Sequence, residues 1–349
     1  MSRAASASPP GAAGDSVIAL EGLTKRYGEL VAVDGVSFDV RRGEIFGILG
    51  PNGAGKTTTL EMIEGLSRPD GGRVVVDGVP VWPDPAPVKA RIGVQLQATA
   101  LFDYLRLYEI IRLFGSCYGL RRTEAEIDAL LARVGLLEKR GSYAAQLSGG
   151  QQQRLSIALA LVNDPVITFL DEPTTGLDPR ARRQLWDVIR AINEAGTTVV
   201  LTTHYMEEAE RLCERVAVMD HGRVMALDTP RALVHGLGAD AHITFTLSAP
   251  LHLDELCALD GVSGCGAHEA EGYSMVAANA QRAVVSLLEL AAARGLTVEN
   301  LDVQGANLED VFLQMTGRKL AEEEEEDERH GDDVKKPRRR PFFMGSGGR

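Results

Sequence analysis

The first two thirds of the chain alternate short apolar segments with turns and helical patterns, from residue 17 to about residue 220. Four of these segments, at residues 45–49, 166–170, 197–202 and 216–219, are rich in β-branched residues. Strands buried on both faces of a parallel sheet have this composition. The alternation therefore predicts an α/β domain with a largely parallel sheet covered by helices.

Residues 101–145 show a different pattern, in which apolar residues recur at helical spacing. Leu107, Ile110 and Ile111 fall on one face of a helix. We therefore expect a small helical insert, at about residues 98–146, within the first domain.

A second, smaller unit begins near residue 241. Ile243, Phe245 and Leu247 alternate with other residues, which suggests a half-buried strand. The elements predicted after it are a helix at 253–259, strands at 261–266 and 273–276, a helix at 280–294, a strand at 297–303, and a helix at 308–315 capped by Asn307. This βαββαβ order with a closing helix suggests a ferredoxin-like α+β sandwich. No catalytic cluster is recognisable in it, so we expect a packing or regulatory role.

These patterns divide the chain into a leader (1–15), a first domain (16–235), an accessory domain (241–317) and a charged tail (318–349). The leader lacks the basic start and apolar centre of a secretion signal, so we expect the chain to stay in the cytoplasm. The tail joins an acidic run to a basic run, which predicts disorder. The basic run could contact anionic lipid, but the acidic run beside it favours a solvated tail.

Charge and hydropathy limit the kinds of partner and membrane contact that we expect for the chain. No apolar run approaches the roughly 18 residues that a membrane-spanning helix needs, so the chain is not expected to cross a bilayer by itself. A formal net charge of −12 would repel a nucleic-acid backbone, and nucleic acid is not an expected partner. The four cysteines, Cys117, Cys213, Cys257 and Cys265, show neither C-x-x-C spacing nor a disulfide-dense pattern. We expect them to be small buried apolar residues in a reducing compartment.

A complete phosphate-binding loop follows the strand at residues 45–49. Its residues are Gly50, Pro51, Asn52, Gly53, Ala54, Gly55, Lys56 and Thr57. Glycines let backbone N–H groups converge on phosphate oxygens, and the N-terminus of the following helix adds partial positive charge. Lys56 is expected to reach the β- and γ-phosphates, and the Thr57 hydroxyl to bind Mg²⁺.

Two acidic residues end another predicted strand. Asp171 and Glu172 come directly after four apolar residues, where a carboxylate is costly unless it has a partner. Asp171 is therefore a candidate Mg²⁺ ligand. Glu172 is placed to orient or deprotonate an attacking water.

These motifs form an ordered set. Residues 147–154 (Leu-Ser-Gly-Gly-Gln-Gln-Gln-Arg), 167–173 (Ile-Thr-Phe-Leu-Asp-Glu-Pro) and 176–178 (Gly-Leu-Asp) follow the phosphate loop. Together they resemble the nucleotide-binding domain of ATP-binding-cassette (ABC) transporters, from about residue 17 to residue 229. The resemblance implies a P-loop NTPase fold and hydrolysis of ATP with Mg²⁺.

The resemblance also implies roles for individual residues. Glu172, the switch histidine His204 and the glutamine Gln97 would be catalytic, with Gln95 as a nearby competitor for the role of Gln97. Thr57, Gln97 and Asp171 would hold Mg²⁺. The implied ATP contacts are Tyr27 on the adenine, residues 50–57, Thr58, and the residues Ser148, Gly149, Gly150, Gln151 and Asp178.

One chain supplies only half of such a site. Ser148, Gly149 and Gly150 open a predicted helix and form a second anion-binding terminus, which in the family closes over ATP on the opposite subunit. A second ATP-binding subunit is implied, as a homodimer or with a close relative. A separate transmembrane permease is also implied, which would place the chain at the cytoplasmic face of the membrane.

The accessory domain and residues 306–318 resemble the bacterial drug-efflux branch typified by daunorubicin-resistance ATPases. This favours export of a hydrophobic compound, with a lipid or polysaccharide exporter as the alternative. Soluble ABC proteins of the ribosome or of DNA repair are a further alternative. Only about 50 residues separate Gln97 from Ser148, without heptads or zinc spacing, which argues against these soluble classes.

Overall fold

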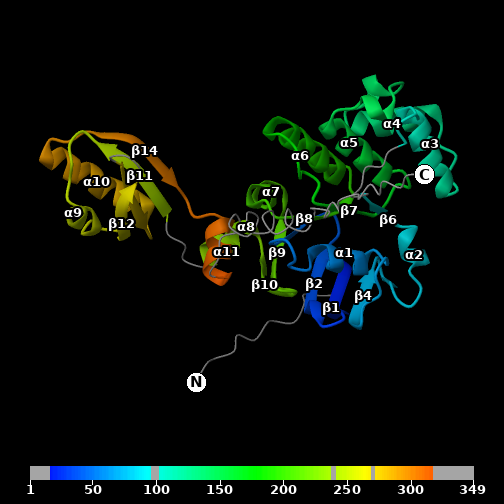
Figure 1. Ribbon diagram of the computed structural model, residues 1–349, viewed down its shortest axis with the longest axis horizontal. Coiled ribbons are helices and arrows are strands. Elements are labelled where there is room, and N and C mark those ends of the chain that lie inside the picture. The colour runs from blue at the N-terminus through cyan, green and yellow to red at the C-terminus, as the bar shows by residue number, and fades with distance from the viewer. Residues whose placement is uncertain (1–15, 96–101, 237–240, 269–271, 317–349) are drawn as a thin grey trace, which may run out of the picture.

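The computed structural model describes residues 16–95, 102–236, 241–268 and 272–316. Their strands form three sheets, of which two build the first domain and one builds the accessory domain (Figure 1). None of the helices in these four ranges is long and apolar enough to cross a membrane.

The first sheet is antiparallel, with strand order β2-β1-β4-β5. Its strands are β1 (Ser16–Tyr27), β2 (Leu30–Arg41), β4 (Gly71–Val76) and β5 (Val79–Pro80). The expectation of a largely parallel sheet was wrong for this part of the chain. Tyr27 pairs with Leu30 across a two-residue turn, where Gly28 takes a φ of 61°, so the chain reverses at once instead of crossing over through a helix.

The second sheet has the order β10-β9-β3-β8-β7-β6 and is parallel except for the β9–β10 pair. Its strands are β3 (Ile45–Leu49), β6 (Ile92–Val94), β7 (Ile167–Asp171), β8 (Thr198–Thr203), β9 (Arg215–Asp220) and β10 (Arg223–Asp228). The four predicted apolar strands are all present, with ends shifted by at most one residue. Candidate site residues follow the carboxyl ends of β3, β7 and β8, which meet at one edge of a parallel sheet.

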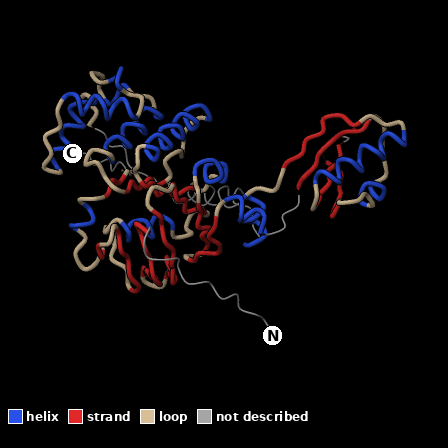
Figure 2. The backbone as a smooth tube through the Cα atoms, turned by 180° about the vertical axis from the view of Figure 1, so that it is seen from behind, coloured by secondary structure: helices blue, strands red, loops and turns tan. Residues whose placement is uncertain are grey.

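Helices of the first domain fall into two groups (Figures 1 and 2). Those connecting the strands are α1 (Lys56–Ile63), α2 (Ala86–Lys89), α6 (Pro179–Glu194), α7 (Met206–Leu212) and α8 (Pro230–Gly236). The predicted helical insert contains α3 (Leu107–Cys117) and α4 (Glu124–Arg133), which pack on α5 (Gly149–Ala160). Two short 3₁₀ turns, Leu137–Lys139 and Ala144–Gln146, connect α4 to α5.

The accessory domain has the predicted βαββαβ order. Its antiparallel sheet has the order β12-β13-β11-β14. The elements are β11 (Ala241–Leu247), α9 (Leu253–Cys257), β12 (Val262–His268), β13 (Gly272–Ala277), α10 (Ala280–Arg294) and β14 (Val298–Gln304). Ile243 and Phe245 are buried with Leu287 of α10 in a separate small core. This strand order is that of the ferredoxin-like sandwich.

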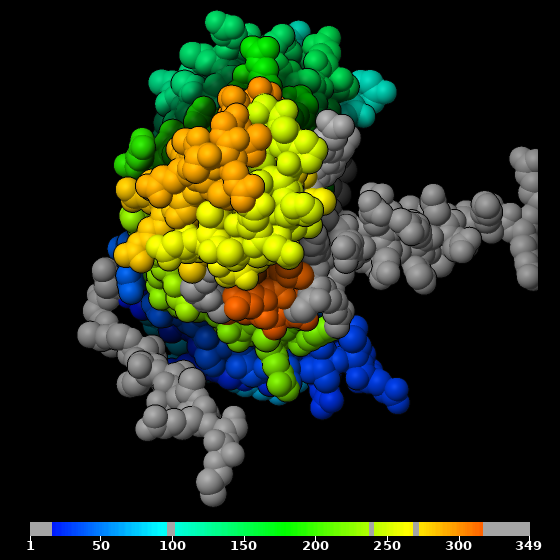
Figure 3. All heavy atoms as spheres, turned by 90° about the vertical axis from the view of Figure 1, so that its left-hand side faces the viewer, coloured from blue at the N-terminus to red at the C-terminus, as the bar shows by residue number. Residues whose placement is uncertain are grey.

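The closing helix α11 (Leu308–Thr316) returns to the first domain (Figures 1 and 3). Leu308, Val311 and Phe312 are buried in the core that contains the helices of the first domain, and α11 contacts α7 and α8. The Leu308 N–H donates to Glu210 Oε1 of α7 over 2.8 Å. Asn307 caps the helix as predicted, since its Oδ1 accepts from the N–H groups of the second and third residues that follow it.

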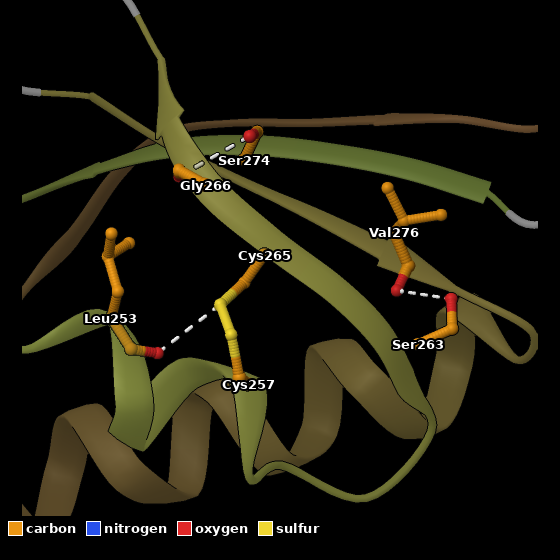
Figure 4. The surroundings of a disulfide bond; sticks show 7 residues. All are labelled: Leu253, Cys257, Ser263, Cys265, Gly266, Ser274 and Val276. Carbon is orange, nitrogen blue, oxygen red and sulfur yellow. Dashed lines mark hydrogen bonds between the residues drawn. A yellow bond between two sulfur atoms is a disulfide. The ribbon is translucent and has the colours of Figure 1, made fainter.

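The cysteines correct one expectation. Cys257, at the end of α9, and Cys265, on β12, form a disulfide with a Cα–Cα distance of 5.3 Å (Figure 4). Cys117 is exposed. The prediction of four buried apolar thiols holds only for Cys213, whose burial raises its pKa. The Cys257–Cys265 pairing arises because α9 packs beside β12, and a spacing of eight residues gives no C-x-x-C signal.

Candidate functional site

The phosphate loop connects β3 to α1 and can be built only with glycine at two points. Gly55 caps α1 at a φ of 94°, and a Cβ there would lie 2.3 Å from the carbonyl oxygen of Ala32. A Cβ on Gly50 would lie 2.2 Å from the carbonyl oxygen of Met219. The loop therefore packs tightly on its own scaffold, and it leads directly into the N-terminus of α1, where an anion can bind.

The Lys56 side chain contacts the first residues of the phosphate loop. Its side chain is only 4% exposed, and Nζ donates to the carbonyl oxygens of Gly50 at 2.7 Å and Pro51 at 2.9 Å. Nζ also lies 3.4 Å from Glu172 Oε1. The structure thus brings the predicted phosphate-binding lysine and the predicted catalytic base into one ion pair.

An oxygen-rich cluster adjoins the loop. Thr57 Oγ1 lies 3.3 Å from Asp171 Oδ1 and 3.2 Å from Oδ2. Thr202 Oγ1 of β8 donates to the same carboxylate. Carboxylate and hydroxyl oxygens are the ligands that Mg²⁺ prefers, and it commonly completes its coordination with water and substrate phosphates.

Glu172 takes an unusual backbone conformation at the end of β7. Its φ is 45°, in the left-handed region that residues other than glycine seldom adopt, and its N–H donates to Thr202 Oγ1 over 3.0 Å. The hydrogen bond with His204 lowers the pKa of Glu172 to about 2, and the Lys56 charge acts in the same direction against burial. Glu172 is therefore ionised at neutral pH.

His204 follows β8 and faces the same carboxylate. Its Nδ1 lies 3.3 Å from Glu172 Oε1, and its side chain is 8% exposed. The ring centroids of His204 and Tyr205 are 4.0 Å apart. The resemblance implied catalytic roles for both Glu172 and His204, and the structure brings their side chains into contact.

The Ser148 segment lies elsewhere. Ser148 caps α5, and its N–H donates to Gln151 Oε1 over 3.0 Å. Asp178 caps the neighbouring α6, because its Oδ1 accepts from two backbone N–H groups at 2.9 Å. A Cβ on Gly150 would lie 3.1 Å from Cβ of Ala181, so the starts of α5 and α6 are close together. α5 packs among the insert helices, whereas α1 packs on β2, β4 and β7 (Figure 1).

The remaining predicted residues are distributed as follows. Tyr27 lies at the end of β1, is 49% exposed, and has Lys25 Nζ 5.4 Å from its ring centroid. In and after the phosphate loop, Asn52 is exposed and Thr58 is half-buried. Gln97 lies outside the described residues. Its competitor Gln95 is buried.

Two polar residues of the site were missed by the sequence reasoning. Thr202 contacts both Asp171 and the Glu172 N–H, and a threonine at the carboxyl end of an apolar strand was the available signal. Glu64 lines a cavity of about 140 Å³ with Thr57, Gln95 and Asp171. Burial, followed by the charge of Asp171, raises the pKa of Glu64 to about 8. No sequence pattern distinguished Glu64 from a surface glutamate.

Comparison with known proteins places this geometry among relatives. The family model described as "ABC transporter" matches residues 33–175. The chain is 39% identical over 307 residues to the linearmycin resistance ATP-binding protein LnrL of Bacillus subtilis, covering 86% of this chain and 99% of that protein. It is 38% identical over 306 residues to the daunorubicin resistance ATP-binding protein DrrA3 of Streptomyces coeruleorubidus, covering 87% and 96%.

A third relative is the Nod factor export ATP-binding protein I of Ralstonia nicotianae, at 39% identity over 320 residues, covering 90% of this chain and 98% of that protein. Among solved structures, an ATP-binding subunit of an ABC transporter superposes with a TM-score of 0.57 at 30% identity, covering 64% of this chain and 94% of that one. The dimeric structure of a bacterial ABC transporter cassette gives a TM-score of 0.55 at 31% identity, covering 61% and 98%.

Proposed function

This chain belongs to the ABC transporter family as one of its ATP-hydrolysing subunits, and from that premise we propose that it powers export of a hydrophobic, antibiotic-like compound through a separate permease. The observation that carries the catalytic half of this proposal is the convergence on Glu172. Lys56 Nζ and His204 Nδ1 both lie within 3.4 Å of its Oε1, at the carboxyl edge of the sheet.

The roles of the residues follow from this geometry. Backbone amides of the phosphate loop and Lys56 bind the phosphates, with Lys56 exchanging its present loop carbonyls for phosphate oxygens. Glu172, ionised and half-buried, orients and deprotonates the attacking water. His204 contacts the same Oε1 of Glu172 as Lys56 does, and its proposed role is to contact the γ-phosphate. Tyr27 offers an exposed ring to the adenine.

The oxygen cluster fits Mg²⁺. Thr57 and Asp171 already lie within 3.3 Å of each other and would hold the ion together with phosphate oxygens. The ion would neutralise charge on the phosphates during transfer. Gln97 is proposed as a further ligand on the strength of the sequence motif. Thr202 orients the Asp171 carboxylate for this purpose.

The Ser148 segment supports a dimer. Ser148, Gly149 and Gly150 begin α5, which contacts the insert helices and α6, and we propose that their amides bind a phosphate held by a second copy. We propose a homodimer in which each phosphate loop is covered by the other subunit's Ser148 segment. The dimeric cassette among the similar structures supports this arrangement.

The transported compound is proposed from the relatives. The linearmycin and daunorubicin resistance proteins align over nearly their whole length, including the accessory domain. We infer that the chain works at the cytoplasmic face of the membrane, docked on a permease. The Nod factor export proteins match equally well, which supports export of a different class of compound, such as a lipid or polysaccharide, as the second candidate.

Replacement of the proposed base tests the catalytic half. We expect Glu172→Gln to bind ATP as tightly as the wild type but to lose turnover by at least about a hundredfold, because the amide cannot take a proton. Glu207→Gln, at an exposed glutamate paired with Arg211, is the matched control and keeps full turnover. Undiminished hydrolysis by Glu172→Gln would rule out the assignment.

Co-expression with a candidate permease tests the transport half. We expect the two chains to co-purify, and the pair to raise the resistance of a sensitive host to a hydrophobic antibiotic. The same pair with Glu172→Gln should give no resistance. Recovery of the chain free of any membrane protein, with resistance unchanged, would contradict the exporter proposal.

A further inference from the structure

Glu208 is a buried glutamate that is not among the proposed catalytic residues but lies close to the segments that contain them. Glu208 is in the first turn of α7 and is 0% exposed. Trp186 Nε1 of α6 donates to Glu208 Oε1 over 3.0 Å. A carboxylate is seldom buried this fully unless it has partners, because desolvation of a charge is costly.

The neighbours of Glu208 come from three different parts of the site. Burial raises the pKa of Glu208, and the Thr203 hydroxyl, the Trp186 indole and the Thr174 hydroxyl act in the opposite direction. Thr203 directly precedes His204, and Thr174 follows Glu172 by two residues. Glu208 is hydrogen-bonded to Trp186 of α6 and lies four residues after His204, whose Nδ1 is 3.3 Å from Glu172 Oε1 in the site.

A second contact joins α6 to the same region. Arg182 Cζ lies 4.2 Å from the ring centroid of Tyr205, whose ring centroid is 4.0 Å from that of His204. Arg182 and Trp186 are one helical turn apart, so they lie on a single face of α6. Arg182 contacts Tyr205, and Trp186 contacts Glu208. The N-terminus of this helix is capped by Asp178, beside the start of α5.

We propose that Glu208 is a positioning residue for ATP hydrolysis, which with Trp186 and Arg182 connects the His204 segment to α6 and so holds His204 beside Glu172. Because α6 begins beside the Ser148 segment, this contact links the arrangement of His204 and Glu172 to the surface that meets the second subunit. The proposal rests on the catalytic roles proposed above for Glu172 and His204.

The test compares turnover with ATP affinity in the full chain. We expect Glu208→Gln, which preserves shape but replaces a carboxylate oxygen by an amide nitrogen, to lower kcat by about tenfold or more while the KM for ATP changes by less than about twofold. Trp186→Phe, which replaces the indole by a smaller aromatic ring without an N–H donor, should act in the same direction. Either variant can be used if the other fails to fold.

Two matched controls separate positioning from general destabilisation. Glu44→Gln changes another buried glutamate, which lies away from the site. Its Oε1 accepts a hydrogen bond of 3.2 Å from Arg215 Nη1. Trp82→Phe removes the other tryptophan, whose Nε1 donates to the Met62 carbonyl oxygen over 3.3 Å. Both should keep the wild-type kcat at temperatures where the chain is folded.

Trp82→Phe also makes Trp186 the only tryptophan of the chain. In that background we expect addition of Mg²⁺ and ATP to change the Trp186 emission, and Glu208→Gln to abolish the change. Wild-type kcat in both Glu208→Gln and Trp186→Phe, with Glu172→Gln inactive, would overturn the positioning proposal alone. Retained turnover in Glu172→Gln would instead overturn the catalytic assignment on which it rests.

Discussion

At the scale of single residues, the site is held by contacts that depend on two strand ends. Thr202 accepts from the Glu172 N–H and donates to Asp171, so one hydroxyl contacts both the backbone of the proposed base and the side chain of the proposed metal ligand. The left-handed φ of Glu172 turns its side chain toward Lys56 and His204. Strain of this kind persists where surrounding contacts determine the conformation, as they do here.

Glu64 gives the site a dependence of stability on pH. Burial and the charges of Asp171 and Glu61 raise its pKa to about 8 from the ordinary 4.5. The folded chain therefore binds this proton more tightly than the unfolded chain does. The stabilisation is present in full below about pH 4.5 and is lost as the pH rises through about 8.

We therefore expect the free energy of unfolding, measured in urea, to fall less between about pH 5 and pH 9 in Glu64→Gln than in the wild type. The difference between the two losses should be roughly 1–3 kcal/mol. The amide cannot ionise, so its burial cost does not change with pH. Measurements are made without Mg²⁺, and Glu21→Gln, at an exposed glutamate, serves as the control. A pH dependence of Glu64→Gln equal to that of the wild type would disprove this.

Sequence reasoning located the residues of the site whose chemistry comes from a local motif. The phosphate loop and the acidic pair after β7 could be predicted because loop, strand end and helix start follow one another in the chain. Thr202 and Glu208 could not, because their importance comes from partners about 30 and 22 residues away, in Asp171 and Trp186. A threonine or glutamate has no local pattern that reveals such a contact.

At the scale of elements, α11 connects the two domains through apolar burial. The sequence analysis assigned it to the accessory domain (241–317), but Leu308, Val311 and Phe312 are buried in the core of the first domain. The helical pattern predicted α11 and its Asn307 cap, because both signals are local. Its packing partner was not predictable, since an apolar helix face does not specify which of two domains covers it.

Phe312→Ala should therefore destabilise the first domain, although the residue follows the accessory sheet in the chain. We expect a loss of about 3–5 kcal/mol from the cavity and the lost apolar contacts. Both tryptophans, Trp82 and Trp186, belong to the first domain, so intrinsic fluorescence reports its unfolding. Leu288→Ala, at an exposed position of α10, is the control and should stay within about 0.5 kcal/mol of the wild type. A shift in Phe312→Ala no larger than in this control would contradict the packing.

At the scale of the whole molecule, the two segments of the proposed ATP site, the phosphate loop and the Ser148 segment, lie in different groups of elements. The phosphate loop lies with α1 beside the antiparallel sheet, and the Ser148 segment lies with the insert helices (Figure 1). The proposed dimer completes both sites at once, because two copies exchange the same pair of surfaces. Contacts of ATP with both subunits then stabilise the dimer, and hydrolysis removes the contacts made by the γ-phosphate.

This arrangement predicts how subunits associate. In the Glu172→Gln background, ATP should convert the purified chain to a species of twice the mass, measured by light scattering. Adding Ser148→Arg should leave the chain monomeric while it still binds ATP, because the phosphate loop is intact and only the covering surface is blocked. Ser116→Arg, at an exposed serine of α3, is the control and should dimerise normally. Dimerisation by the Ser148→Arg chain would refute the shared site.

The return of α11 to the first domain has a consequence for biosynthesis. The ribosome releases α7 and α8 well before residues 308–316, so the growing chain must carry an incomplete apolar surface while the whole accessory domain is translated. Domains generally fold as units from the N-terminus during synthesis. Here the first domain to emerge is the last to be completed, and a transcript cut short after the accessory sheet would yield an uncovered, aggregation-prone ATPase rather than a smaller working one.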